Sequence, residues 1–306
     1  MRRLVCVTLM ALLIVSFAGI GMAAKGTIKI GAKNFTEQYV VGELMKILLE
    51  ENGYKVDYKS GMGTAIVRKA LEEGAIDLYM EYTGTGWMTH LGHLFEGESA
   101  DELYQKVKEE DAGKGLVWLD AIKCNNTYAL AVRREFSEQH NLKTLSDLAS
   151  YVKEKKGKVP IASGFEFYAR PDGLIGLMKL YEFAFHPDYI KVMAVGLTFG
   201  FLQQKEVDVT MVFGTDPVVQ KYNWVVLQDD KSFFPPYDLC PVIRKETAEN
   251  FPEVVELLNK LISVFPTDRV EARAAMTALN YKVDISKMDA ADAAREFLVE
   301  QGLIKK

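Results

Sequence analysis

Four aromatic residues stand at the ends of expected strands or in loops, each beside small polar residues. They are Tyr82 in Glu81-Tyr-Thr-Gly-Thr85, Tyr128 in Asn125-Asn-Thr-Tyr128, Phe213 in Val212-Phe-Gly-Thr-Asp216 and Tyr237 in Phe233-Phe-Pro-Pro-Tyr-Asp238. Aromatic rings fill cores, but their faces also attract cations. In open α/β sheets ligands bind beyond the carboxyl ends of strands, where the loops after Tyr82 and Phe213 are expected. One such ring is typical of packing, whereas four in this setting favour a ligand site.

The residues needed for catalysis do not form a recognisable pattern. The sequence has no Gly-x-Ser-x-Gly elbow and no phosphate-binding loop, and Gly84-Thr-Gly86 lacks the third glycine of a dinucleotide fingerprint. No pair of carboxylates is marked out as general acid and base. His90 and His93 lack a partner at a familiar metal spacing and favour a solvated helix surface. We therefore expect a protein that is not an enzyme and has no cofactor and no metal.

Composition and charge exclude several classes of protein. The chain has 306 residues, of which 49% are hydrophobic and 26% charged, with a formal net charge of −5. These values exclude a disordered chain, a collagen and a coiled coil, and they give no basic field for nucleic acid. The length corresponds to about two domains, or to one large domain.

The first segment, residues 1–24, has the pattern of a secretory signal peptide. Arg2 and Arg3 precede an apolar stretch over 4–22, and Ala23-Ala24 provides the small residues of a cleavage site. A membrane anchor is the alternative, because the apolar stretch is nearly long enough to span a bilayer. Cleavage near Ala24 predicts an exported, periplasmic protein.

The mature chain alternates between strands and helices. The hydrophobic pattern predicts one set of strands at 27–31, 54–58, 77–82 and 116–119, and a second at 128–132, 158–162, 189–192 and 207–212. Strands at 225–227 and 240–244 return the chain, and the last sixty residues are helical. This alternation predicts parallel sheets covered by helices on both faces. No flexible linker separates the two sets, so we expect the chain to cross between two lobes as strands that act as a hinge.

Several motifs resemble one family when they are taken in order. The run Gly31-Ala-Lys-Asn-Phe-Thr-Glu-Gln38 is followed by Asp77-Leu-Tyr-Met-Glu-Tyr-Thr-Gly-Thr85, Asn126-Thr-Tyr-Ala-Leu130, Thr215-Asp216 and Asp229-Asp-Lys-Ser-Phe-Phe-Pro-Pro-Tyr237. Together they resemble the osmoprotectant-binding proteins of ATP-driven importers, which are receptors for glycine betaine, choline and carnitine. The resemblance covers essentially the whole mature chain.

The resemblance implies a type II periplasmic-binding-protein fold, with two mostly parallel sheets and a two-strand hinge. Its first lobe would comprise residues 25–123 and the returning segment 239–306, and its second lobe residues 124–238. It implies a monomer that closes over a quaternary ammonium ligand and delivers it to the membrane permease of an ABC importer.

The resemblance also assigns ligand contacts to individual residues. It places an aromatic cage at Tyr82, Tyr128, Phe213 and Tyr237, and polar contacts at Lys33, Gln38, Thr85, Asn126 and Arg170. Phe213 departs from the family pattern because a Tyr is common there. Asn126 stands where some members carry Asp, and the segment around Arg170 aligns less closely than the rest.

Elementary chemistry supports the same ligand class. A quaternary ammonium has no hydrogen to donate, so ring faces hold it better than hydrogen-bonding groups do. Lys33 and Arg170 would repel a bare cation, so their presence favours a zwitterion such as glycine betaine over choline. An exported two-lobed enzyme is the alternative function, as is a receptor for choline, carnitine, ergothioneine or an amino acid.

Two cysteines, Cys124 and Cys240, remain after export into a compartment that permits disulfides. They flank the points at which the chain should cross between lobes. Because two hinge strands run side by side, we expect these residues to form a disulfide, with two buried free thiols as the alternative.

Overall fold

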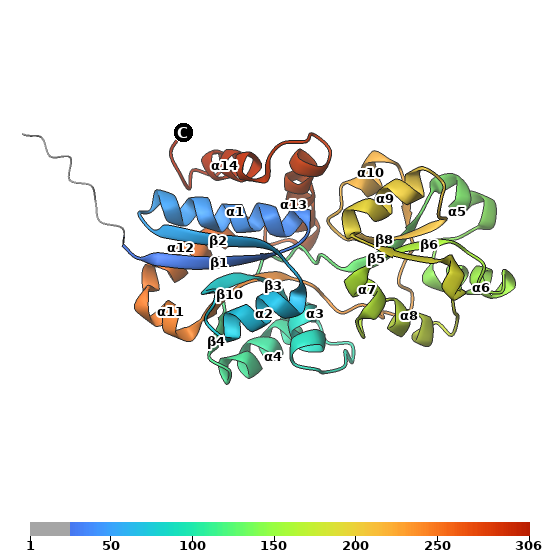
Figure 1. The fold of residues 1–306 in the computed structure, drawn as a ribbon, viewed down its shortest axis with the longest axis horizontal. Helices are drawn as coiled ribbons and strands as arrows, with labels where there is room; N and C mark the ends of the chain where they lie inside the picture. The colour runs from blue at the N-terminus through green and yellow to red at the C-terminus, as the bar shows by residue number, and fades with distance from the viewer. Residues whose placement is uncertain (1–24) are drawn as a thin grey trace, which may run out of the picture.

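The computed structural model describes residues 25–306, which form two α/β lobes side by side (Figure 1). The expected signal peptide over residues 1–24 lies outside the described residues. The first sheet has the strand order β2-β1-β3-β10-β4 and the second the order β7-β6-β8-β5-β9. The strands of the first sheet are β1 Thr27–Lys33, β2 Lys55–Met62, β3 Leu78–Tyr82, β4 Leu116–Trp118 and β10 Leu239–Arg244. Those of the second are β5 Tyr128–Val132, β6 Ile161–Gly164, β7 Ile190–Met193, β8 Val209–Phe213 and β9 Val225–Val226.

Both sheets are mixed rather than mostly parallel. In the first sheet β1 pairs in parallel with β2 and β3, whereas β10 runs antiparallel to β3 and β4. The second sheet repeats this arrangement, because β6 pairs in parallel with β7 and β8, and β5 runs antiparallel to β8 and β9. The antiparallel strands β5 and β10 are those that follow each crossing of the chain between lobes. The two-lobed α/β architecture expected from the sequence is confirmed.

Helices cover both faces of each sheet, as Figure 1 shows. Those of the first lobe are α1 Thr36–Glu51, α2 Thr64–Glu72, α3 Thr83–Thr85, the π-helical turn η1 Gly86–His90, α4 Ala100–Ala112, α11 Lys245–Asn250, α12 Pro252–Ser263, α13 Arg269–Asp284 and α14 Ala290–Glu300. Those of the second are α5 Arg134–His140, α6 Leu145–Glu154, α7 Phe165–Ala169, α8 Leu174–Leu180, the 3-10 turn η2 Pro187–Tyr189, α9 Val195–Gln203 and α10 Val218–Lys221.

The strands bury alternate side chains on opposite faces, as the two-residue period of a strand requires. On β3, Leu78, Met80 and Tyr82 join the core that α1 covers, whereas Tyr79 faces the opposite core under α2 and α4. This alternation places the ring of Tyr82 at the end of β3 on the face that continues toward the second lobe.

The chain crosses between lobes as two adjacent segments. Ile122 and Leu239 form an antiparallel bridge, and the Asn126 N–H donates to the carbonyl of Tyr237 at 2.9 Å. The expected side-by-side crossing is therefore present just before β5 and β10.

The disulfide expected from this crossing is absent, because Cys124 and Cys240 are both free thiols. The register explains the correction: Ile122 pairs with Leu239, so the two cysteines are offset along the crossing segments. Cys124 packs in the core on the α1 side of the first sheet, and Cys240 packs in the core on the α2 side. Because the two side chains pack in different hydrophobic clusters, their sulfur atoms do not meet the geometry of a disulfide.

Within residues 25–306, no helix is long and apolar enough to cross a bilayer.

Candidate ligand-binding site

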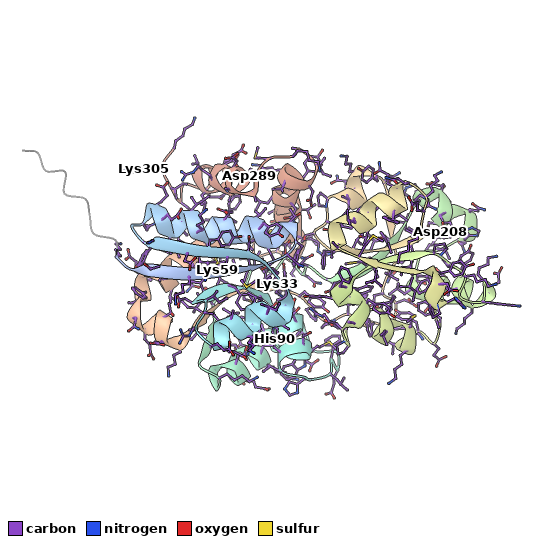
Figure 2. The ribbon with its side chains drawn as sticks, in the orientation of Figure 1. Lys33, Lys59, His90, Asp208, Asp289 and Lys305 are labelled. Atoms are coloured by element: carbon purple, nitrogen blue, oxygen red, sulfur yellow. The ribbon has the colours of Figure 1, made fainter. Side chains whose placement is uncertain are left out.

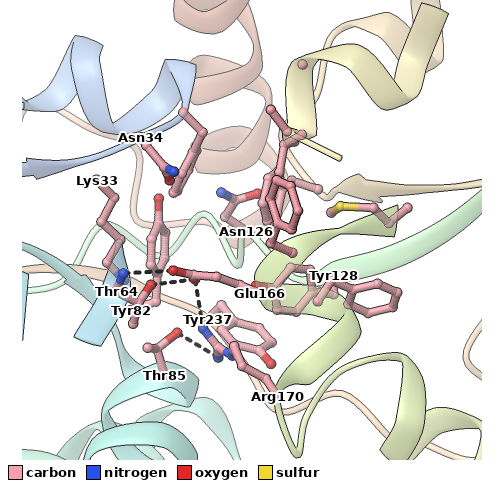
Figure 3. Close-up of a pocket in the computed structure, with 18 residues that line it drawn as sticks. Lys33, Asn34, Thr64, Tyr82, Thr85, Asn126, Tyr128, Glu166, Arg170 and Tyr237 are labelled. Atoms are coloured by element: carbon pink, nitrogen blue, oxygen red, sulfur yellow. Dashed lines mark hydrogen bonds and ion pairs between the residues drawn. The ribbon is translucent and has the colours of Figure 1, made fainter. Parts of the chain in front are cut away.

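A cavity of about 190 Å³ lies between the two lobes (Figure 3). Eight of the nine residues expected to contact a ligand line it: Lys33, Tyr82, Thr85, Asn126, Tyr128, Arg170, Phe213 and Tyr237. They come from the ends of β1, β3 and β8, the start of β5, the ends of α3 and α7, and the two crossing segments. The fold therefore brings together residues as far apart in the sequence as Lys33 and Tyr237.

Gln38 is the exception among the expected contacts, because it does not line the cavity. Its side chain is fully buried behind the cavity wall. Its Oε1 accepts from the Lys33 N–H at 3.3 Å, and its Nε2 donates to the Tyr82 hydroxyl at 3.2 Å. Gln38 thus fixes two lining residues and does not itself reach the cavity.

The rings of the cavity form a continuous aromatic wall. Tyr128 and Phe213 are register partners on β5 and β8, with ring centroids 5.3 Å apart. The ring of Tyr237 meets Tyr128 edge-on at 5.8 Å. Phe167 packs against Tyr128 at 4.9 Å and completes this wall from α7. These packed rings line one cavity, and the face of an aromatic ring attracts a cation.

Phe35 is an aromatic lining residue that sequence reasoning did not assign. It stands immediately before α1, at the N-cap position, where it makes no side-chain cap. Its ring stacks with Phe213 at 5.0 Å and with Tyr82 at 6.2 Å. Phe35 therefore connects the ring of Tyr82 in the first lobe with the ring of Phe213 in the second. Its position inside the motif Lys33-Asn-Phe-Thr-Glu was the available signal.

Lys33 is buried at the end of β1 and already has an anionic partner. Its Nζ lies 2.5 Å from Oε1 of Glu81 and 5.2 Å from the centre of the Tyr82 ring. Burial lowers the pKa of Lys33, while Glu81 opposes this shift. Burial would raise the pKa of Glu81, but Lys33 and His90 outweigh it and hold that pKa well below its usual range. Figure 2 shows Lys33 near the middle of the molecule, whereas Asp289 and Lys305 lie at its periphery.

Glu81 also pairs with His90, for which the sequence predicts a solvated helix surface. The Nε2 of His90 lies 2.8 Å from Oε2 of Glu81, and the imidazole is buried with a side-chain exposure of 4%. The expected solvated position is therefore wrong for His90. The π-helical turn η1 directs this side chain inward, and no local pattern in the sequence reveals such a turn.

Arg170 forms the other cationic part of the wall. It pairs with the buried carboxylate of Asp172, through Nε to Oδ1 at 2.8 Å and through Nη2 to Oδ2. Its Nη2 also donates to Thr85 Oγ1 at 3.2 Å, across the gap between the lobes. The Tyr237 hydroxyl donates to the same Asp172 at 2.5 Å. Asp172, which sequence reasoning missed, thus orients both Arg170 and Tyr237.

A third buried carboxylate, Glu37 on α1, lies behind Tyr82. It accepts hydrogen bonds from the Tyr82 hydroxyl at 2.7 Å, Asn126 Nδ2 at 2.9 Å and Thr215 Oγ1 at 2.6 Å. Asn280 Nδ2 on α13 donates to it at 3.2 Å. Burial raises the pKa of Glu37, and these hydrogen bonds oppose the shift. Glu37 therefore joins the first lobe, a crossing segment and the second lobe.

The residues that line the cavity are suited to binding a small molecule. Ring faces, two ion-paired cations and the polar groups of Thr85 and Asn126 surround one space. Such a wall suits a small molecule with an apolar cationic end and a polar end.

Comparisons with known proteins agree with this reading. The family model described as the substrate binding domain of ABC-type glycine betaine transport systems matches residues 26–300. A glycine-betaine-binding protein of Pseudomonas aeruginosa is 35% identical over 289 residues, which are 93% of this chain and 91% of that protein. An ergothioneine transport permease/ergothioneine binding protein of Helicobacter pylori is 33% identical over 90% of this chain and 47% of that protein. Among solved structures, a glycine betaine/carnitine/choline ABC transporter structure is 26% identical, with a TM-score of 0.69 over 90% of this chain and 99% of that chain.

Proposed function

We propose that this chain, which belongs to the family of substrate-binding domains of ABC-type glycine betaine transport systems, captures a quaternary ammonium compound between its lobes. Glycine betaine is the ligand we favour. The family consists of transport substrate-binding proteins rather than enzymes, so the alternative of an exported enzyme falls away.

The observation that carries the proposal is the aromatic wall around one cavity. Tyr82, Tyr128, Phe213 and Tyr237 line it together with Phe35. A desolvated cation over a ring gains about 2 kcal/mol, so several rings would supply enough for micromolar binding when polar contacts are added. The trimethylammonium group would take the ring faces of this wall.

The polar end of the ligand would face Thr85 and Arg170. Both cations of the wall are ion-paired, Lys33 with Glu81 and Arg170 with Asp172. The site therefore offers oriented donors rather than a net positive charge. A carboxylate gains from charge-assisted hydrogen bonds with such donors, which supports a zwitterion.

The proposal also states where the protein acts and which membrane component receives its ligand. We expect the mature protein to act in the periplasm after loss of residues 1–24, and to pass its ligand as a monomer to the permease of an ABC importer. The signal-like pattern of residues 1–24 and membership of an importer family support this part.

A competition panel tests the ligand class. Protein lacking residues 1–24 is unfolded, dialysed and refolded to remove bound ligand, then titrated with glycine betaine, choline, carnitine, proline betaine and ergothioneine. We expect glycine betaine to bind most tightly. Tightest binding of another member would replace glycine betaine as the ligand, and binding of none would overturn the proposed function.

A further inference from the structure

Glu166 on α7 reaches from the second lobe to the first at the edge of the cavity (Figure 3). Its Oε1 accepts from the Thr64 N–H at 2.7 Å, and its Oε2 accepts from the Thr64 hydroxyl at 2.6 Å. Thr64 is the first residue of α2, and its N–H has no partner within the helix. The pair therefore joins the two lobes through a carboxylate at a helix N-terminus.

The same carboxylate faces the polar end of the cavity. Oε2 of Glu166 lies 3.9 Å from Nη1 of Arg170. Glu166 also acts to raise the pKa of Lys33, although burial, Glu81 and Arg170 have larger effects on that pKa. Among the eighteen residues that line the cavity, Glu166 is the one carboxylate. Its side chain is 40% exposed, so it stands at the rim rather than in the floor.

The carboxylates around the polar end differ in their cationic partners. Lys33 and Arg170 already have their own buried partners, Glu81 and Asp172. Glu166 adds a third carboxylate beside these two cations, and it has no buried cation of its own as a partner. A ligand carboxylate bound by Arg170 would lie beside Glu166 and be repelled by it, whereas a neutral hydroxyl could donate to Glu166.

We propose that Glu166 is a specificity-determining residue that limits the preference of this site for carboxylate-bearing ligands over cationic ones. Specificity is a difference between two affinities, so one repulsive group can set it. The ligand class accepted then includes quaternary ammonium alcohols beside zwitterions. This inference rests on the proposed function, because it assumes that the quaternary ammonium end occupies the aromatic wall.

The hydrogen bonds between Glu166 and Thr64 affect binding in a second way, through closure of the lobes. A bridge between the lobes favours closure for any ligand, so its loss should weaken all ligands by the same factor. The ratio of two dissociation constants cancels this common effect. A change in the ratio of the choline Kd to the glycine betaine Kd therefore reports the local effect of Glu166 on the polar ends of the two ligands.

The test compares this ratio in four proteins by calorimetric titration at pH 7. Glu166→Gln removes the charge and keeps the shape, and Thr64→Ala removes the hydroxyl contact and keeps the charge. Glu138→Gln removes one charge from an exposed position on α5 and serves as the control. We expect Glu166→Gln to raise the ratio of the choline Kd to the glycine betaine Kd at least threefold. Thr64→Ala and Glu138→Gln should leave that ratio within twofold of the unmodified protein.

Two outcomes would overturn the role of Glu166. One is an unchanged or lowered ratio in Glu166→Gln while the unmodified protein binds both ligands. The other is loss of both ligands in that variant, which would show that Glu166 acts on closure alone. Failure of the unmodified protein to bind either ligand would instead refute the proposed function.

Discussion

The hydroxyl of Tyr82 donates a 2.7 Å hydrogen bond to Oε1 of Glu37, a carboxylate that is itself only 2% exposed. Oε2 of the same carboxylate accepts from Thr215 of the second lobe at 2.6 Å. The orientation of a ring in the cavity wall is therefore tied to the position of the opposite lobe. Glu37 does not line the cavity, so it acts on a ligand through Tyr82.

Replacing Glu37 tests this link. Glu37→Ala leaves buried donors unpaired, which costs about 1–3 kcal/mol for each group. We expect lower stability in urea unfolding and binding of glycine betaine weakened at least tenfold. Glu37→Gln still accepts from Tyr82 and should recover part of the affinity. An unchanged Kd in Glu37→Ala would show that Tyr82 needs no such support.

The aromatic wall makes a second prediction. Tyr128→Ala removes a ring that lines the cavity and contacts Phe213, Phe167 and Tyr237. Loss of about 2 kcal/mol of cation–ring attraction corresponds to roughly thirtyfold weaker binding. Tyr281→Ala on α13 is the matched control, because Tyr281 is 43% exposed and does not line the cavity. Equal effects of the two variants on the Kd would argue against the cage.

Asp216 should make the free energy of unfolding fall as the pH rises from about 4 to about 8. Burial raises the pKa of Asp216 from 3.8 to about 8, although the Phe213 N–H that donates to it opposes the shift. Between these values the folded chain holds a proton that the unfolded chain has released. The free energy of unfolding therefore decreases with pH through this window. Urea unfolding at pH 5, 7 and 9 should show a shallower decrease for Asp216→Asn, and parallel curves would contradict the assignment.

The thiols provide a fourth prediction. Cys124 and Cys240 pack in different cores, so protein without residues 1–24 should contain two free thiols. Ellman titration of denatured, unreduced protein measures this number directly. A count of zero would mean that the crossing segments can bring the two sulfur atoms together after all.

Local patterns made much of the fold predictable. Alternation along β3 and the apolar stripe of α1 are properties of short segments, so the sequence shows them directly. The cavity rings were also predictable, because Tyr82 and Phe213 end strands and ligands bind beyond such ends.

The remaining features depend on residues that are distant in the chain. Glu37 accepts hydrogen bonds from Asn126, Thr215 and Asn280. These donors are distant from it in the sequence, so no local pattern predicts them. The cysteine offset depends on the register of two crossing segments, which the sequence does not specify. Gln38 shares a motif with Lys33, yet the helix directs it behind the wall rather than into the cavity.

The most direct test of the aromatic wall compares glycine betaine with 3,3-dimethylbutanoate, its uncharged carbon isostere at the cationic end. Both have the same shape and the same carboxylate, so only the cation differs. Calorimetric titration of the refolded protein should give a micromolar Kd for glycine betaine and binding at least a hundredfold weaker for the isostere, since about 2 kcal/mol per ring is lost. Equal affinities, or no binding of glycine betaine at millimolar concentration, would contradict recognition of a quaternary ammonium by this cavity.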